Sequence, residues 1–129
     1  MVIETSIQYA ELTDIMQALN DRGNFVISVL TDESGLLLAS SDQNPDTSEM
    51  QSAVGAQVQG LVQRVVRHLS MAEPEEITLN DVEGKRLVCR PFRVGDATVI
   101  LAVLIPTKGQ AYRKVMNQAI RSIQQTWNF

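Results

Sequence analysis

Few side chains in this sequence are of the types that carry catalysis or bind metal ions. The chain contains one histidine, His68, and one cysteine, Cys89. A zinc site needs several His or Cys ligands at short spacing, and neither residue has a second one near it. His68 falls in a long predicted helix, where a surface or interface position is a simpler interpretation than a catalytic base. Cys89 falls in an apolar strand and is expected to be a small core residue.

Two further groups resemble catalytic motifs but lack the necessary partners. Ser40, Ser41 and Asp42 form a polar cluster. A serine nucleophile needs an adjacent base, and the sequence supplies none, so this cluster is expected to end a strand. Gly84-Lys85 follows no Gly-rich loop of the type that binds nucleotide phosphates. We therefore predict a protein that is not an enzyme and that has no cofactor and no bound metal.

Composition predicts an ordinary globular domain. The chain has 129 residues, of which 44% are hydrophobic and 20% charged, and a single domain over 1–129 is expected. A formal net charge of −4 disfavours a nucleic-acid partner. The longest apolar run, residues 99–105, is too short to cross a bilayer, and Glu4 stands where a signal peptide would be basic. A lone cysteine fits a reducing cytoplasm, so we expect a soluble, cytoplasmic protein with no membrane insertion.

The elements that position these residues are organised around a hairpin. Residues 25–30 form an apolar run rich in β-branched side chains, and residues 36–39 form a second one. Between them, Asp32, Ser34 and Gly35 supply turn chemistry. Because nearly every residue of the first run is apolar, both of its faces should be covered, and the strand is expected inside the sheet.

Hydrophobic periodicity predicts the remaining elements. They are a first helix over 5–20 with Gly23 as a left-handed cap, a long helix over 49–70 capped by Ser48, strands over 76–80, 85–92 and 98–105, and a last helix over 108–127. Pro91 should interrupt its strand, and the strand over 98–105 should be central because it is continuously apolar. The predicted fold is of the α/β (α+β) class: a five-stranded, mainly antiparallel sheet with helices on both faces, in the order α-β-β-α-β-β-β-α.

The long helix has an apolar arc of roughly 160°, which is wider than the ~100° that covers one sheet. Two interpretations follow: the helix is well buried in its own domain, or part of the arc meets a second copy of the chain. We favour the second, because apolar residues step by four and three as in a helix–helix seam. The strand over 76–80 alternates polar and apolar residues, as an edge strand does. The predicted dimer interface therefore comprises Val54, Val58, Leu61, Val65, Ile77 and Leu79.

These segments resemble the roadblock/dynein light chain domain. The hairpin VISVLTDESGLLLASS has the apolar strand, the acidic-Gly turn and the Leu-rich return of that family. The similarity continues through AVGAQVQGLVQRVVRHL, ITLNDVEGKRLVCRPF and TVILAVLIP, so it covers essentially the whole chain as a single roadblock-like domain. The single-domain bacterial members are the most similar.

The resemblance implies a profilin/longin-like roadblock fold and a non-catalytic interaction module. Family members form homodimers through their long helices and third strands, and many regulate or scaffold small Ras-like GTPases, in some cases by activating them. Activators of this family supply no arginine finger, so Arg64 and Arg67 are not expected to enter a GTPase active site.

A partner-binding surface is expected beside the dimer seam. Gln57, Arg64 and Arg67 flank the apolar arc, and arginine is favoured at recognition surfaces. We hypothesise that these residues contact the GTPase; the alternative is that they are ordinary solvated helix charges. An alternative function, a small-molecule-sensing or general scaffolding domain of related fold, needs convergent polar groups on an apolar face, and the sequence reveals no such set.

Overall fold

The computed structural model describes residues 2–42 and 45–127, with side chains described for 9–42 and 57–127. The helices are α1 (Val2–Gly23), α2 (Pro45–Leu69) and α3 (Arg113–Thr126). The strands are β1 (Ile27–Asp32), β2 (Leu37–Ser40), β3 (Ile77–Asn80), β4 (Arg86–Val94) and β5 (Ala97–Ile105). The predicted order of elements is therefore confirmed.

The five strands form one sheet in the order β2-β1-β5-β4-β3, and each neighbouring pair is antiparallel. β5 lies in the middle, as its continuous apolar run predicts, and β1 lies between β2 and β5. β3 stands at the edge beside β4, as its alternating pattern predicts.

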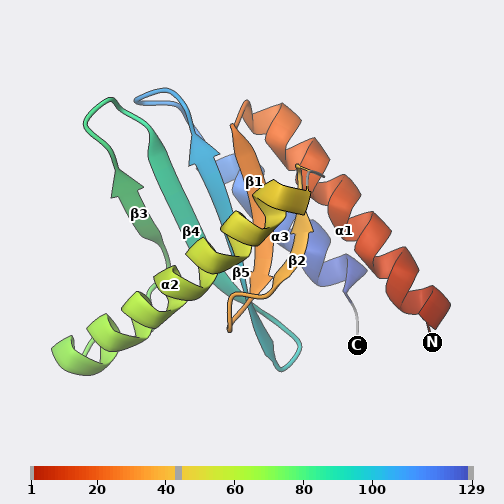
Figure 1. Cartoon of the computed structure of the whole chain (residues 1–129), viewed down its shortest axis with the longest axis horizontal. Helices are drawn as coiled ribbons and strands as arrows, with labels where there is room; N and C mark the ends of the chain where they lie inside the picture. The colour runs from red at the N-terminus through yellow and green to blue at the C-terminus, as the bar shows by residue number, and fades with distance from the viewer. Residues whose placement is uncertain (1, 43–44, 128–129) are drawn as a thin grey trace.

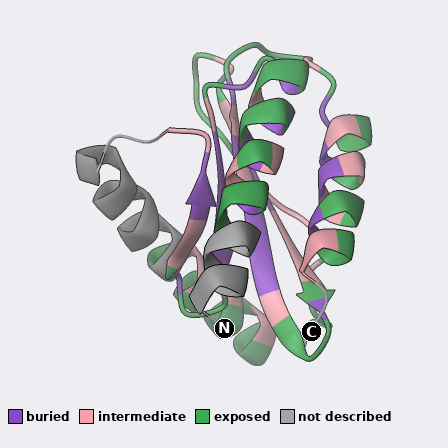
Figure 2. Ribbon diagram, turned by 90° about the vertical axis from the view of Figure 1, so that its right-hand side faces the viewer, coloured by how far each residue is buried: buried purple, intermediate pink, exposed green. Residues whose placement is uncertain are grey.

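Helices cover both faces of the sheet. α1 and α3 pack side by side on one face, while α2 crosses the other face diagonally (Figure 1). The core lies mainly on the side of α1 and α3, whose buried positions turn toward the sheet (Figure 2). Its fully buried members include Met16 of α1, Leu30 of β1, Leu101 of β5, and Met116 and Ile123 of α3.

All three helices begin at other residues than predicted, and α1 also ends later, at Gly23 and not at residue 20. α2 begins at Pro45, whose fixed φ suits the first helical position, so Ser48 lies inside the helix and is not its cap. α1 begins at Val2, earlier than the predicted start. α3 begins at Arg113 and not at Lys108, because Gly109 takes a positive φ of 78° in a turn closed by Gln110 N–H and the Thr107 carbonyl.

Gly23 is not the left-handed residue that ends α1. That conformation belongs to Asn24, with a φ of 54°. A Cβ on Gly23 would lie 2.2 Å from Cε2 of Phe25, so this position is restricted to glycine by the close approach of the aromatic ring. The prediction of a left-handed cap at Gly23 is therefore wrong by one residue.

Pro91 does not interrupt its strand. β4 continues through Pro91, which pairs with Ile100 of β5, as far as Val94. β3 pairs with β4 only as far as Cys89, so β4 is an edge strand at Pro91. A missing N–H is tolerated there because no neighbouring strand needs it.

Candidate interaction surface

The described part of α2 is poorly covered by the rest of the domain. None of its side chains from Gln57 to Leu69 is buried. Val58, Val62 and Val66, spaced four apart, are half-buried. A second apolar line on the same helix is open, with Leu61 54% and Leu69 67% exposed. The apolar arc of α2 is thus split into one line that is partly covered and one that is not.

The exposed line on α2 comprises Leu61, Val65 and Leu69. Val65, at 36%, is the least exposed of the three. Of the predicted dimer residues on this helix, Leu61 and Val65 belong to the exposed line and Val58 is half-buried. The side chain of Val54 lies outside the described residues. The dimer interface stays a prediction.

β3 offers a second open feature, the edge of the sheet. Leu79 is 67% exposed and pairs across the strands with Leu87, while Ile77 is half-buried opposite Cys89. β3 pairs with β4 on one side only, so its other side carries ladder groups that a further strand can use.

A polar cluster ties the start of β3 to α3. The Tyr112 hydroxyl donates to Glu76 Oε2 at 2.7 Å, and Arg113 Nη2 lies 3.6 Å from the same oxygen. The guanidiniums of Arg86 and Arg113 lie over the Tyr112 ring, at 4.8 and 4.9 Å from its centroid. Burial and the hydrogen bond with Glu76 raise the pKa of Tyr112 from its ordinary value. The edge strand is therefore anchored where it begins.

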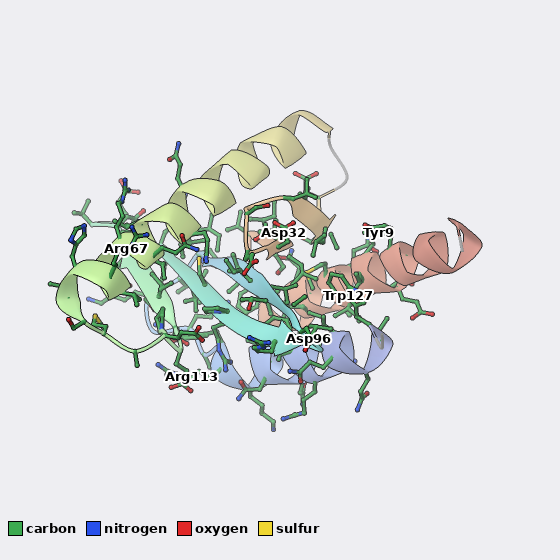
Figure 3. The ribbon with its side chains drawn as sticks, turned by 90° about the horizontal axis from the view of Figure 1, so that it is seen from below. Tyr9, Asp32, Arg67, Asp96, Arg113 and Trp127 are labelled. Carbon is green, nitrogen blue, oxygen red and sulfur yellow. The ribbon has the colours of Figure 1, made fainter. Side chains whose placement is uncertain are left out.

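The predicted partner-binding residues are all exposed, but they are not in one hollow. Arg67 lines a groove between α2 and the ends of β4 and β5, whereas Gln57 and Arg64 do not. Arg67 and Arg113, at the start of α3, lie on opposite sides of the sheet (Figure 3). Their role in binding a partner stays a prediction.

The groove was not predicted from the sequence. It has a volume of about 540 Å³, and its lining includes Gln59, Val62 and Gln63 of α2 with Phe92 and Thr98 of the strands. These are polar groups converging on an apolar surface, the pattern that binding sites use. The four-residue spacing of the two glutamines is visible in the sequence, but their position opposite the strand ends depends on the fold.

Among the residues considered for catalysis, Cys89 is buried in β4, and Ser40 and Ser41 accept hydrogen bonds from the backbone. Burial raises the pKa of the Cys89 thiol to about 11, which keeps it neutral near pH 7. The Ser28 N–H donates to Ser41 Oγ, and the Asp42 N–H donates to Ser40 Oγ, both at 3.0 Å, so the polar cluster closes the end of β2. Within the described ranges, no group of three or more His, Cys, Asp or Glu residues could hold a metal ion. His68 is exposed on α2.

None of the helices, over the residues described, has the length and apolar character needed to cross a membrane.

A five-stranded antiparallel sheet with two helices on one face, one long half-exposed helix on the other and an open edge at β3 is the architecture of roadblock/LC7 domains. The gliding protein MglB from Thermus thermophilus superposes with a TM-score of 0.71 at 13% identity, over 93% of this chain and 90% of that one. An MglB structure with a tetrameric arrangement gives a TM-score of 0.69 at 13% identity, over 93% and 90%.

A Roadblock/LC7 domain from Streptomyces avermitilis gives a TM-score of 0.64 at 16% identity, over 88% of this chain and 92% of that one. No protein-family model matches the sequence, and no curated protein matches it. The chain therefore has the roadblock/LC7 fold, and the resemblance seen in the sequence is confirmed at the level of the fold.

Proposed function

We propose that this protein is a cytoplasmic, homodimeric and non-catalytic module that regulates or scaffolds a small Ras-like GTPase. The observation that carries the proposal is the exposed apolar line on α2 together with the open edge at β3. Both features are what a second copy of the chain would cover, and both belong to elements that the family resemblance assigns to its dimer interface.

The hydrophobic effect favours such a dimer. Full burial of a Leu or Val side chain contributes about 1.5–3 kcal/mol, and Leu61 and Leu79 are 54% and 67% exposed in the single chain. Pairing of β3 with its copy would satisfy the ladder groups at the sheet edge. The proposed interface is built on Val54, Val58, Leu61 and Val65, with Ile77 and Leu79 near the paired strands.

The GTPase partner is supported by the family resemblance of the sequence, and the fold shared with the gliding protein MglB agrees with that resemblance. In a dimer, the two α2 helices form one platform beside the seam, where Gln57, Arg64 and Arg67 are exposed. Guanidinium groups suit this role because their planar fork makes paired hydrogen bonds while the stem covers apolar surface. We propose that these residues contact the GTPase outside its active site.

The decisive experiment measures binding and turnover with a Ras-like GTPase from the same genome. Titration calorimetry with the GTP-loaded and GDP-loaded forms should give binding at a ratio set by the dimer, and the protein alone should hydrolyse no GTP. Absence of binding to every such GTPase would contradict the partner assignment, and GTP turnover by the protein alone would contradict a non-catalytic role.

A further inference from the structure

The groove beneath α2 combines an apolar floor with a polar rim. Its floor includes Val62 and Val66 of α2 and Pro91 and Phe92 of β4, all half-buried. Its volume of about 540 Å³ falls within the roughly 300–1,000 Å³ of ligand sites. The groove has therefore the size and the surface to hold a ligand that carries apolar groups.

One wall of the groove presents polar side chains at a regular interval. Gln59, Gln63 and Arg67 follow one another at every fourth residue of α2 and all line the groove. A helix rises about 1.5 Å per residue, so their positions repeat every ~6 Å. An extended peptide advances about 6.6 Å for every two residues. The interval on α2 therefore matches the spacing of like-facing groups along an extended chain.

The chemistry of these side chains also suits a peptide backbone. A glutamine amide both donates and accepts hydrogen bonds, so it can pair with a backbone C=O and N–H at once. The residues from Gln59 to Arg67 span eight helical steps, or about 12 Å. That length corresponds to roughly four residues of extended chain.

The charges on the rim select against other ligand classes. Arg67 and Arg93 contribute two cations, and Glu33 and Glu73 contribute two anions. These four side chains, all within the described residues, form no ion pair with one another. A polyphosphate would meet both carboxylates, and a polyamine would meet both guanidiniums. A ligand with both signs of charge, or with none, avoids these repulsions.

We infer that this groove binds an extended segment of a partner protein, about four residues long at its core. An apolar side chain of the segment lies on the floor at Val62 and Val66, its backbone pairs with Gln59 and Gln63, and flanking side chains of opposite sign meet the rim charges. Of the residues proposed to contact the GTPase, Arg67 also lines the groove, whereas Gln57 and Arg64 do not. The variants of Gln59, Gln63 and Val66 described below leave Arg67 unchanged, so they test the groove separately from the proposed GTPase contact.

A display library of random seven-residue peptides, selected on the wild-type protein, supplies the probe. The strongest binders are then synthesised and their dissociation constants measured. We expect enriched sequences with an apolar residue between charges of both signs, and at least tenfold weaker binding to the double variant Gln59→Ala/Gln63→Ala. Val66→Arg, which fills the floor, should weaken binding by at least as much. The matched control Gln125→Ala, exposed on α3 on the other face of the sheet, should bind as wild type does.

Three results would overturn the inference. The first is that no peptide is enriched above the bare support. The second is equal binding of the synthesised peptides to wild type and to the folded double glutamine variant, which tests the groove even if Val66→Arg does not fold. The third is that amide NMR shifts caused by the peptide cluster at β3 or α3 and spare Val62, Val66 and Thr98.

Discussion

The hydroxyl of Tyr112 donates a hydrogen bond to Oε2 of Glu76 over 2.7 Å, and this bond joins the residue before α3 to the residue before β3. Tyr112 is 4% exposed, so its hydroxyl would have few alternative partners without Glu76. Because β3 is the open edge of the sheet, this bond anchors the strand on which the proposed dimer depends.

Tyr112→Phe should lower the free energy of unfolding by about 1–2 kcal/mol, because it removes the shortest hydrogen bond to the Glu76 carboxylate and leaves only the longer contacts with Thr78 Oγ1 at 3.4 Å and Arg113 Nη2 at 3.6 Å. Urea denaturation of the two proteins measures the difference. Tyr9→Phe is the matched control, since Tyr9 is 46% exposed on α1, and its effect should be within about 0.5 kcal/mol of zero. Equal losses in the two variants would argue against the anchoring role of Tyr112.

The stability of the protein at alkaline pH should also depend on Tyr112. The folded-state pKa of Tyr112 is raised above its unfolded value, so the folded state holds this proton more tightly. Its contribution is complete below the unfolded pKa of about 10 and is lost as the pH rises through the folded pKa. Urea denaturation at a series of pH values from 8 to 11 measures this loss. As the pH rises, the free energy of unfolding should fall more for wild type than for Tyr112→Phe. Parallel pH profiles would show that Tyr112 is not responsible.

Two glycines should respond in opposite ways to alanine. Gly23→Ala should destabilise the fold by about 1–3 kcal/mol, because its Cβ would lie 2.2 Å from the Phe25 ring. A Cβ on Gly60 would have no neighbouring heavy atom within 4 Å, so Gly60→Ala should stabilise helix α2 by up to about 1 kcal/mol. Thermal unfolding of both variants measures these changes in stability. A Gly23→Ala protein as stable as wild type would contradict the close approach of the Phe25 ring to Gly23.

The central elements of the fold could be predicted because their signals are local. β5 and the hairpin of β1 and β2 follow from uninterrupted apolar runs and from turn residues such as Asp32, whose Oδ1 accepts hydrogen bonds from the N–H groups of Ser34 and Leu36, both at 2.9 Å. The edge position of β3 also follows from a local pattern, the alternation of polar and apolar residues.

Features that depend on distant parts of the chain could not be predicted in this way. The loop before α3 is held by the Gln110 side chain, which donates to the carbonyl oxygens of Gly23 and Asn24 at the end of α1. No periodicity near residue 110 reveals that contact, and so the sequence pattern places the start of α3 too early. The groove has the same origin, since Gln63 and Thr98 line one groove only after α2 has packed across the sheet.

Changing both Arg64 and Arg67 to Glu should weaken binding of the cognate GTPase at least tenfold, or about 1.4 kcal/mol, because two guanidinium donors become repelling carboxylates. Calorimetry gives the affinity, and sedimentation verifies that the dimer persists. The control Lys114→Glu/Arg121→Glu changes two exposed cations on α3, on the opposite face. If only the control variant lost affinity, the GTPase would bind the α3 face instead.

The dimer is the claim on which the proposed function depends, and sedimentation velocity at micromolar concentration tests it most directly. The mass obtained for the wild-type protein should be twice the 14.3 kDa of one chain. Leu61→Glu should have the mass of one chain or should precipitate, because the substitution would place a charge in the apolar seam. A wild-type protein that sediments as a single chain at these concentrations would contradict the account.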